Sequence, residues 1–143
     1  MPAIPTDERL LAEIYKRYVR PFSDWSDENK TRSAKIWVPI DVDALASKFR
    51  CDPDLIFGRL YYHMNEKYGS HTGDGDRVNF FNIRLGQDRH CVNFPLLTSV
   101  LADLQDDRKR FLISTRVAGL SLIVSAISIL IAIFWKGGPV ILP

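Results

Sequence analysis

The feature that most constrains this chain is a run of nineteen residues without a charge, from Val117 to Trp135. As an α-helix, a run of this length reaches roughly 28 Å, close to the ~30 Å hydrocarbon core of a bilayer. The alternative is a buried helix of a soluble protein, but a helix that is apolar on every face and ends at a Trp is unusual there. The run therefore predicts a single transmembrane helix in the membrane lipid bilayer.

Basic residues flank this run unevenly. Only Lys136 follows it, whereas four precede it: Arg108, Lys109, Arg110 and Arg116. Because Lys and Arg beside a span stay on the cytoplasmic side, the N-terminal part is expected in the cytosol. The N-terminus has no basic start followed by the apolar core of a secretory peptide. We expect a single-pass protein with a C-terminal anchor, whose work is done by residues 1 to about 110 at the inner membrane face.

Residues 1–110 are long enough for one small domain, and they carry seventeen Lys and Arg against seventeen Asp and Glu. Without the three basic residues 108–110, which the membrane explains, fourteen basic residues face seventeen acidic ones. Such a domain lacks the electrostatic footprint of a nucleic-acid binder. Cys51 and Cys91 have no metal-binding spacing and are expected to be buried thiols, so no metal or cofactor is predicted.

Hydrophobic spacing predicts a first helix that Thr6 caps and that ends at Pro21. Residues 23–34 are polar apart from Trp25 and predict a loop. The alternation in residues 35–40 predicts a short strand, which Pro39 restricts to the edge of a sheet.

Two helices with a short connection follow. Asp41 or Asp43 is expected to cap the first, and Asp52 to cap a second that ends before Gly69. A pair joined so closely should cross at a large angle, as in a helix-turn-helix.

The next pattern predicts a β-hairpin, because residues 78–85 and 90–94 alternate on either side of Gly86-Gln87-Asp88-Arg89. Phe81, Ile83 and Leu85 are expected on one face of its first strand. Pro95 opens a last helix, and nothing after it breaks the helix before the apolar run.

This order resembles the winged helix-turn-helix superfamily, and "VDALASKFRCDPDLIFGRLYYHMNEKYG", from Val42 to Gly69, resembles its helix-turn-helix segment. The resemblance covers residues 6–94 and rests on element order and apolar spacing. It implies an α+β fold, a winged-helix-like domain of helix, short strand, helix, helix and β-hairpin, followed by a long C-terminal helix that becomes the span. The expected parts are the cytosolic domain at 1–94, a juxtamembrane helix at 95–116, the transmembrane helix at 117–135 and a short tail at 136–143.

In winged helices that bind DNA, the second helix of the pair enters the major groove. Here that helix starts with Asp52 and Asp54, which repel phosphate, followed by apolar residues. The basic residues that could contact nucleic acid or a protein partner lie on this helix and in or near the hairpin: Arg59, His63, Lys67, Arg84 and Arg89. The alternative for the three helix residues is an ordinary solvated face.

A protein-interaction role is the preferred interpretation, because the domain leans acidic and fold does not fix function. Tyr61 and Tyr62 are consecutive, so a helix cannot point both toward one interior, and an exposed aromatic side chain is a common interface anchor. The alternative is that the aromatic residues pack beneath the 23–34 loop.

No enzyme is expected, since the chain has no Gly-rich phosphate loop or nucleophile motif. Asp74-Gly75-Asp76 lacks the spacing of a calcium loop, and His90 and Cys91 should point to opposite faces of a strand. The predicted function is a membrane-anchored, non-catalytic protein-binding module. The alternative is a membrane-tethered, DNA-binding transcriptional regulator.

The apolar run also carries a stripe of small residues at alternating spacings of three and four. Only Gly119 and Ala126 lie off the stripe, whose members are Ser114, Ala118, Ser121, Ser125, Ser128 and Ala132. Such a seam lets two helices approach closely with left-handed packing, which predicts a homodimer through the span. The alternative is chance in a segment rich in Ser and Ala.

Overall fold

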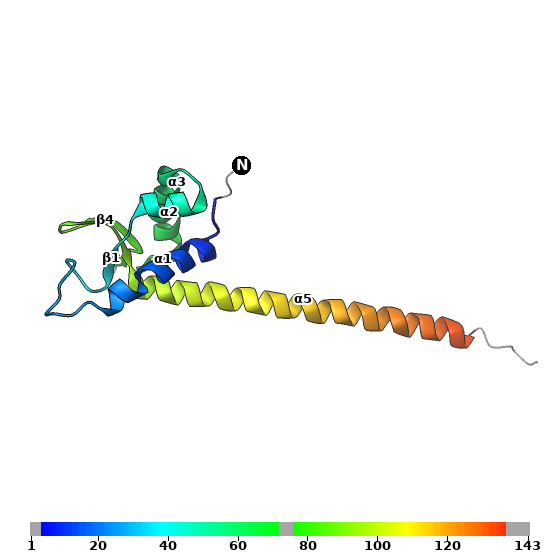
Figure 1. Cartoon of the computed structure of the whole chain (residues 1–143). Coiled ribbons are helices and arrows are strands. Elements are labelled where there is room, and N and C mark those ends of the chain that lie inside the picture. The colour runs from blue at the N-terminus through cyan, green and yellow to red at the C-terminus, as the bar shows by residue number, and fades with distance from the viewer. Residues whose placement is uncertain (1–3, 72–75, 137–143) are drawn as a thin grey trace, which may run out of the picture. The chain divides into compact units, whose positions relative to one another are not determined.

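The computed structural model describes residues 4–71 and 76–136, with the side chains of residues 71 and 136 left aside, and it mixes helices with a small antiparallel sheet (Figure 1). The chain divides into a folded unit, Met1–Leu104, and a second unit, Gln105–Pro143. The elements are α1 (Asp7–Ser23), β1 (Trp37–Pro39), α2 (Val42–Phe49), α3 (Pro53–Gly58), the π-helix η1 (Arg59–Met64), α4 (Asn65–Tyr68), β2 (Ser70–His71), β3 (Arg77–Val78), β4 (Phe81–Leu85), β5 (Asp88–Asn93) and α5 (Phe94–Lys136).

Helix α1 begins as predicted, because the Thr6 side chain accepts a hydrogen bond from the backbone of the first turn. The predicted end at Pro21 is wrong, since α1 continues to Ser23. A proline near a helix end removes only its own N–H, and here the last turn is closed by the Asp24 N–H, which donates to the Arg20 carbonyl at 2.9 Å.

Helices α2 and α3 meet at a tight break. Asp41 caps α2 by accepting the Ala44 N–H at 2.9 Å, and Arg50 ends it in the left-handed conformation at φ 54°. Asp52 caps α3 as predicted, and Pro53 lies in its first turn. The sequence predicts one α-helix from there to Gly69, but its middle third is the π-helix η1. Apolar spacing alone could not distinguish these helix types.

The sheet has the order β1-β5-β4, with neighbouring strands antiparallel. Strand β1 lies at its edge, as Pro39 predicts. The turn between β4 and β5 is only Gly86-Gln87, two residues shorter than expected, because Asp88 pairs with Leu85 in the ladder. Gly86 has φ +60°, which suits a tight hairpin turn.

The predicted burial of alternate residues in β4 holds at Phe81 and fails at Ile83, which is 45% exposed. The register joins Asn82 to Cys91 and Arg84 to Arg89, so the pair between them, Ile83 and His90, drops out of the ladder. His90 has φ 52°, a left-handed value that breaks the regular pleat at this point.

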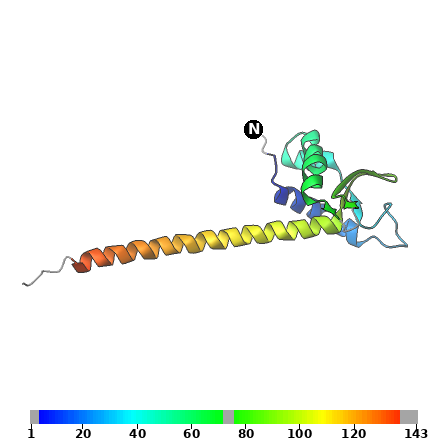
Figure 2. The same ribbon diagram turned by 180° about the vertical axis from the view of Figure 1, so that it is seen from behind.

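One core joins the helices of the folded unit to the sheet. Phe94, the first residue of α5, stacks on Tyr15 and Phe22 of α1, with ring centroids 5.9 and 4.7 Å away, and α1 runs beside the start of α5 in both views (Figures 1 and 2). The buried side chains come from α1, α2, α3, η1, the hairpin and the first turns of α5: Leu10, Leu11, Ile14, Leu45, Ile56, Leu60, Met64, Phe81, Val92, Leu97 and Leu101.

Helix α5 runs without a break from Phe94 to Lys136, as the sequence predicts for the segment after Pro95. It is long and apolar enough to span a membrane, and its residues 111–135 are all exposed.

Candidate functional site

Three of the five candidate contact residues meet at a single buried carboxylate. Asp7, at the start of α1, is 8% exposed. Its Oδ1 accepts from Arg59 Nη2 at 2.6 Å and from Arg59 Nε at 3.0 Å, while its Oδ2 accepts from Lys67 Nζ at 3.2 Å and from the Tyr68 hydroxyl at 2.8 Å. His63 Nε2 lies 3.5 Å from the same Oδ2. The three basic residues predicted on this helix, which we call the basic stripe, thus gather around an acid contributed by α1.

Burial raises the pKa of Asp7, but the hydrogen bonds from Tyr68, Arg59 and Lys67 outweigh it and lower the pKa from 3.8 to about 2. The carboxylate is therefore charged at neutral pH and holds its cations by charge-assisted hydrogen bonds. Arg59 is committed to the fold, since its fork bonds Asp7 twice.

The π-helix explains why three residues spaced by four reach one atom group. Four residues make slightly more than one turn of an α-helix and slightly less than one turn of a π-helix. In a helix that contains both types, residues spaced by four therefore stay nearly on one line along the helix. Arg59 and His63 lie in η1, and Lys67 lies in α4.

The solvent face of α3, η1 and α4 has a different character. Its exposed residues away from the Asp7 cluster are acidic, aliphatic or aromatic: Asp54, Leu55, Tyr62 and Glu66, the last of which pairs with Arg77 at 2.6 Å. Tyr62 is 72% exposed, whereas Tyr61 is half-buried, as expected for consecutive tyrosines. We call these four residues the outer face of the helix.

A row of rings leads from the outer face to the hairpin. Tyr62 contacts Tyr61 at a centroid distance of 5.0 Å, Tyr61 stacks on Phe57 at 5.6 Å, and Phe57 meets the His90 ring edge-on at 5.6 Å. His90 also stacks on Phe81 at the core, at 6.3 Å. Exposed aromatic side chains supported by buried ones resemble the anchors of protein interfaces.

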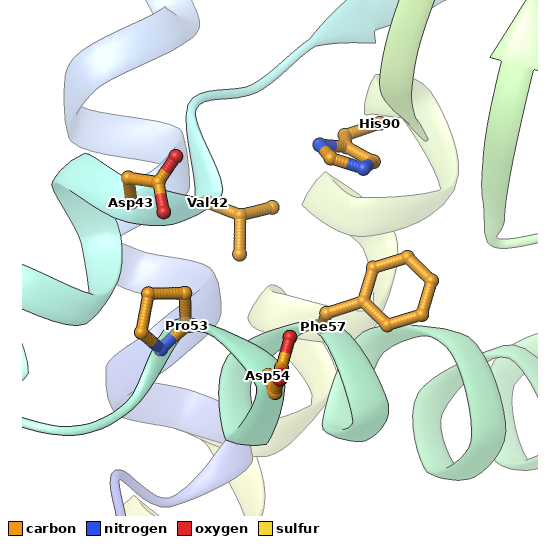
Figure 3. Close-up of a pocket in the computed structure, with 6 residues that line it drawn as sticks. All are labelled: Val42, Asp43, Pro53, Asp54, Phe57 and His90. Atoms are coloured by element: carbon orange, nitrogen blue, oxygen red, sulfur yellow. The ribbon is translucent and has the colours of Figure 1, made fainter.

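A pocket of about 280 Å³ lies beside this row, between the first turns of α2 and α3 and the hairpin (Figure 3). Figure 3 shows the His90 and Phe57 rings on one side, Asp43 on the other, and Asp54 beside Phe57 on α3. Its walls are Val42, Asp43, Pro53, Asp54, Phe57 and His90. This pocket could not be predicted from the sequence, because its residues come from three elements and the left-handed conformation of His90 has no sequence signature.

The two remaining candidates, Arg84 and Arg89, face each other across the hairpin near its turn, and both are exposed. Arg84 Nε donates to the Gly86 carbonyl at 3.2 Å. Within residues 4–71 and 76–136, the Arg89 side chain has no hydrogen bond or ion pair. The hairpin is also fastened at its turn, where Asp88 Oδ2 accepts the Ser33 N–H at 2.7 Å.

The predicted small-residue stripe lies on α5 and is exposed along its length, including Ser114, Ala118 and Ala132. Three of its hydroxyls donate within the helix to carbonyls one turn earlier: Ser121 to Val117 at 3.0 Å, Ser125 to Ser121 at 2.8 Å and Ser128 to Val124 at 2.9 Å. Such bonds satisfy a hydroxyl in an apolar surrounding.

Chemistry-bearing residues elsewhere are dispersed. Burial raises the pKa of the Cys91 thiol to about 11, with the Asp88 charge as a smaller cause, and this disfavours the thiolate. Among the described residues, no three His, Cys, Asp or Glu side chains gather as a metal site. The Asp74-Gly75-Asp76 triplet lies outside the described residues except for Asp76.

No protein family, characterised protein or solved structure matches this chain.

Proposed function

We propose that this protein is a membrane-anchored, non-catalytic module whose cytosolic domain, a winged-helix-like fold, binds another protein at the inner membrane face. The winged-helix assignment is supported by the element order and by the sheet order β1-β5-β4, in which the first strand pairs with the second strand of the hairpin. The α2–α3 pair then corresponds to the helix-turn-helix, and the β4–β5 hairpin to the wing.

One observation carries the choice of a protein partner. The helix that would enter the DNA groove has its Arg59 and Lys67 side chains turned to Asp7, while its outer face presents Asp54, Tyr62 and Glu66. A surface of carboxylates and aromatic rings repels phosphate but suits a protein interface.

The membrane part of the proposal is supported by α5, whose exposed apolar length suffices for a span. Its basic residues before the apolar run, among them Arg110 and Arg116, favour a cytosolic folded unit.

DNA binding remains the second candidate, and the hairpin favours it. Arg84 and Arg89 place two like charges directly opposite each other, an arrangement that costs stability unless an anion relieves it. A membrane-tethered transcriptional regulator would use this pair on the phosphate backbone.

Site-specific photo-crosslinking in living cells tests both candidates. A benzophenone amino acid is placed at Tyr62 on the outer face, at Arg89 on the hairpin or, as the control, at Lys16, an exposed residue of α1. We expect a discrete adduct from position 62 that protease removes and nuclease leaves intact, and none from position 16. A nuclease-sensitive adduct at position 62 or 89 would favour the regulator, and no adduct at position 62 contradicts a partner on the outer face.

A further inference from the structure

We propose that the pocket between α2, α3 and the hairpin receives a basic side chain, arginine or lysine, from the partner protein. This inference rests on the proposed function and names the chemistry by which that partner is recognised. Charge complementarity, the aromatic wall and the size of the pocket support this occupant.

Four aspartates at the starts of α2 and α3 have two different roles. Asp41 and Asp52 cap their helices, accepting backbone N–H groups at 2.9 and 2.8 Å. Asp43 and Asp54, each two residues later, line the pocket, and their carboxylates form no hydrogen bond or ion pair with any residue in the described ranges. The helix caps therefore do not need these two carboxylates, which remain available to a ligand.

The pocket contains nothing that would compete for them. Its lining, within the part of the chain that the structure covers, includes neither Lys nor Arg. The basic residues of the same helix, Arg59 and Lys67, are held at Asp7 instead. An incoming cation thus meets two carboxylates without displacing an internal one.

The second wall suits the flat face of a guanidinium or the stem of a lysine. Phe57 and His90 stand opposite Asp43 in Figure 3, with Asp54 beside Phe57, and the two rings pack edge-on at 5.6 Å. A cation over an aromatic face gains electrostatic energy, and the methylenes of a basic side chain pack well on such a wall.

The pocket is large enough for a single basic side chain. The volume of about 280 Å³ lies just below the ~300–1,000 Å³ of typical small-molecule sites. Tyr62 contacts Tyr61, which stacks on Phe57 at the pocket. A partner whose basic side chain enters the pocket would therefore contact Tyr62 with its neighbouring surface.

The test uses the full chain in detergent micelles with ¹³C-labelled histidine rings. The probes are N-acetyl-arginine amide and its neutral isostere, N-acetyl-citrulline amide. We expect the arginine probe to shift the His90 ring signal in a saturable way and the citrulline probe to leave it unchanged. His63, at the Asp7 cluster, is the internal control, and His63→Gln and His71→Gln variants assign the three histidine signals.

Two substitutions connect the pocket to the partner. Asp43→Asn with Asp54→Asn should weaken the arginine response about tenfold and reduce the photo-adduct from position 62 to a similar degree, since charge-assisted bonds are lost. Asp103→Asn, which removes an exposed carboxylate of α5, should change neither. Unaltered near-ultraviolet circular dichroism would show that the double variant folds.

The outcomes separate this inference from the proposed function. An adduct at position 62 whose yield does not fall in the double variant overturns the inference and leaves the protein-binding role intact. Equal shifts from both probes, or no shift of His90, also overturn it. Absence of any adduct at position 62 overturns both.

Discussion

At the scale of single residues, Asp7 determines how the basic stripe is interpreted. Its sequence position marks it as an ordinary acid in the first turn of a helix. The structure instead buries it against Arg59 and Lys67, which are 52 and 60 positions away. The stripe itself could be predicted from its spacing of four, but its partner could not, because no local pattern encodes a contact at that separation.

The pH dependence of stability tests this cluster. Because the pKa of Asp7 is about 2 when folded and 3.8 ordinarily, its contribution should be complete above pH ~4 and lost as the pH falls toward 2. We expect a loss of roughly 2 kcal/mol in the free energy of unfolding across that window. Denaturant titrations of the full chain in micelles, followed by tryptophan fluorescence, measure it.

Two variants isolate the contribution of Asp7. Asp7→Asn should lower stability at neutral pH by a similar amount and remove most of the pH dependence. Asp27→Asn, whose side chain is 87% exposed, should behave like the natural protein. A pH profile that Asp7→Asn leaves unchanged would contradict the cluster's role.

At the scale of elements, the predictions from strong local signals were confirmed, whereas the irregular features could not be predicted. Capping at Thr6 and Asp52 and the hairpin's existence followed from residue chemistry. The π-helix, the left-handed His90 and the pocket depend on packing between elements, which periodicity does not encode. Those irregular features shape the candidate site, so its basic and aromatic residues could be predicted but their grouping could not.

The predicted self-association of α5 belongs to this scale. Ser121→Leu with Ser125→Leu should fill the small-residue seam and reduce dimerisation in a membrane reporter by several-fold, since close helix approach requires small side chains. Gly119→Leu with Ala126→Leu, the small residues off the stripe, is the matched control. If both pairs of substitutions have the same effect, the stripe plays no special part.

At the scale of the whole molecule, the proposed location of the folded unit follows from the uncharged run. The run accounts for its flanking basic residues, and without them residues 1–110 lean acidic. That balance agrees with the outer face, where Asp54 and Glu66 are exposed. The sequence thus predicted the character of the surface, although not the residues that line its pocket.

The central claim is that a single span in α5 holds the folded unit on the cytosolic side. Protease protection of an N-terminal tag, compared in intact and selectively permeabilised cells, tests it most directly. We expect the tag to resist protease until the membrane that encloses the cytosol is permeabilised, and the protein to stay in that membrane through alkaline carbonate extraction. Digestion of the tag in intact cells, or release by carbonate, would contradict it.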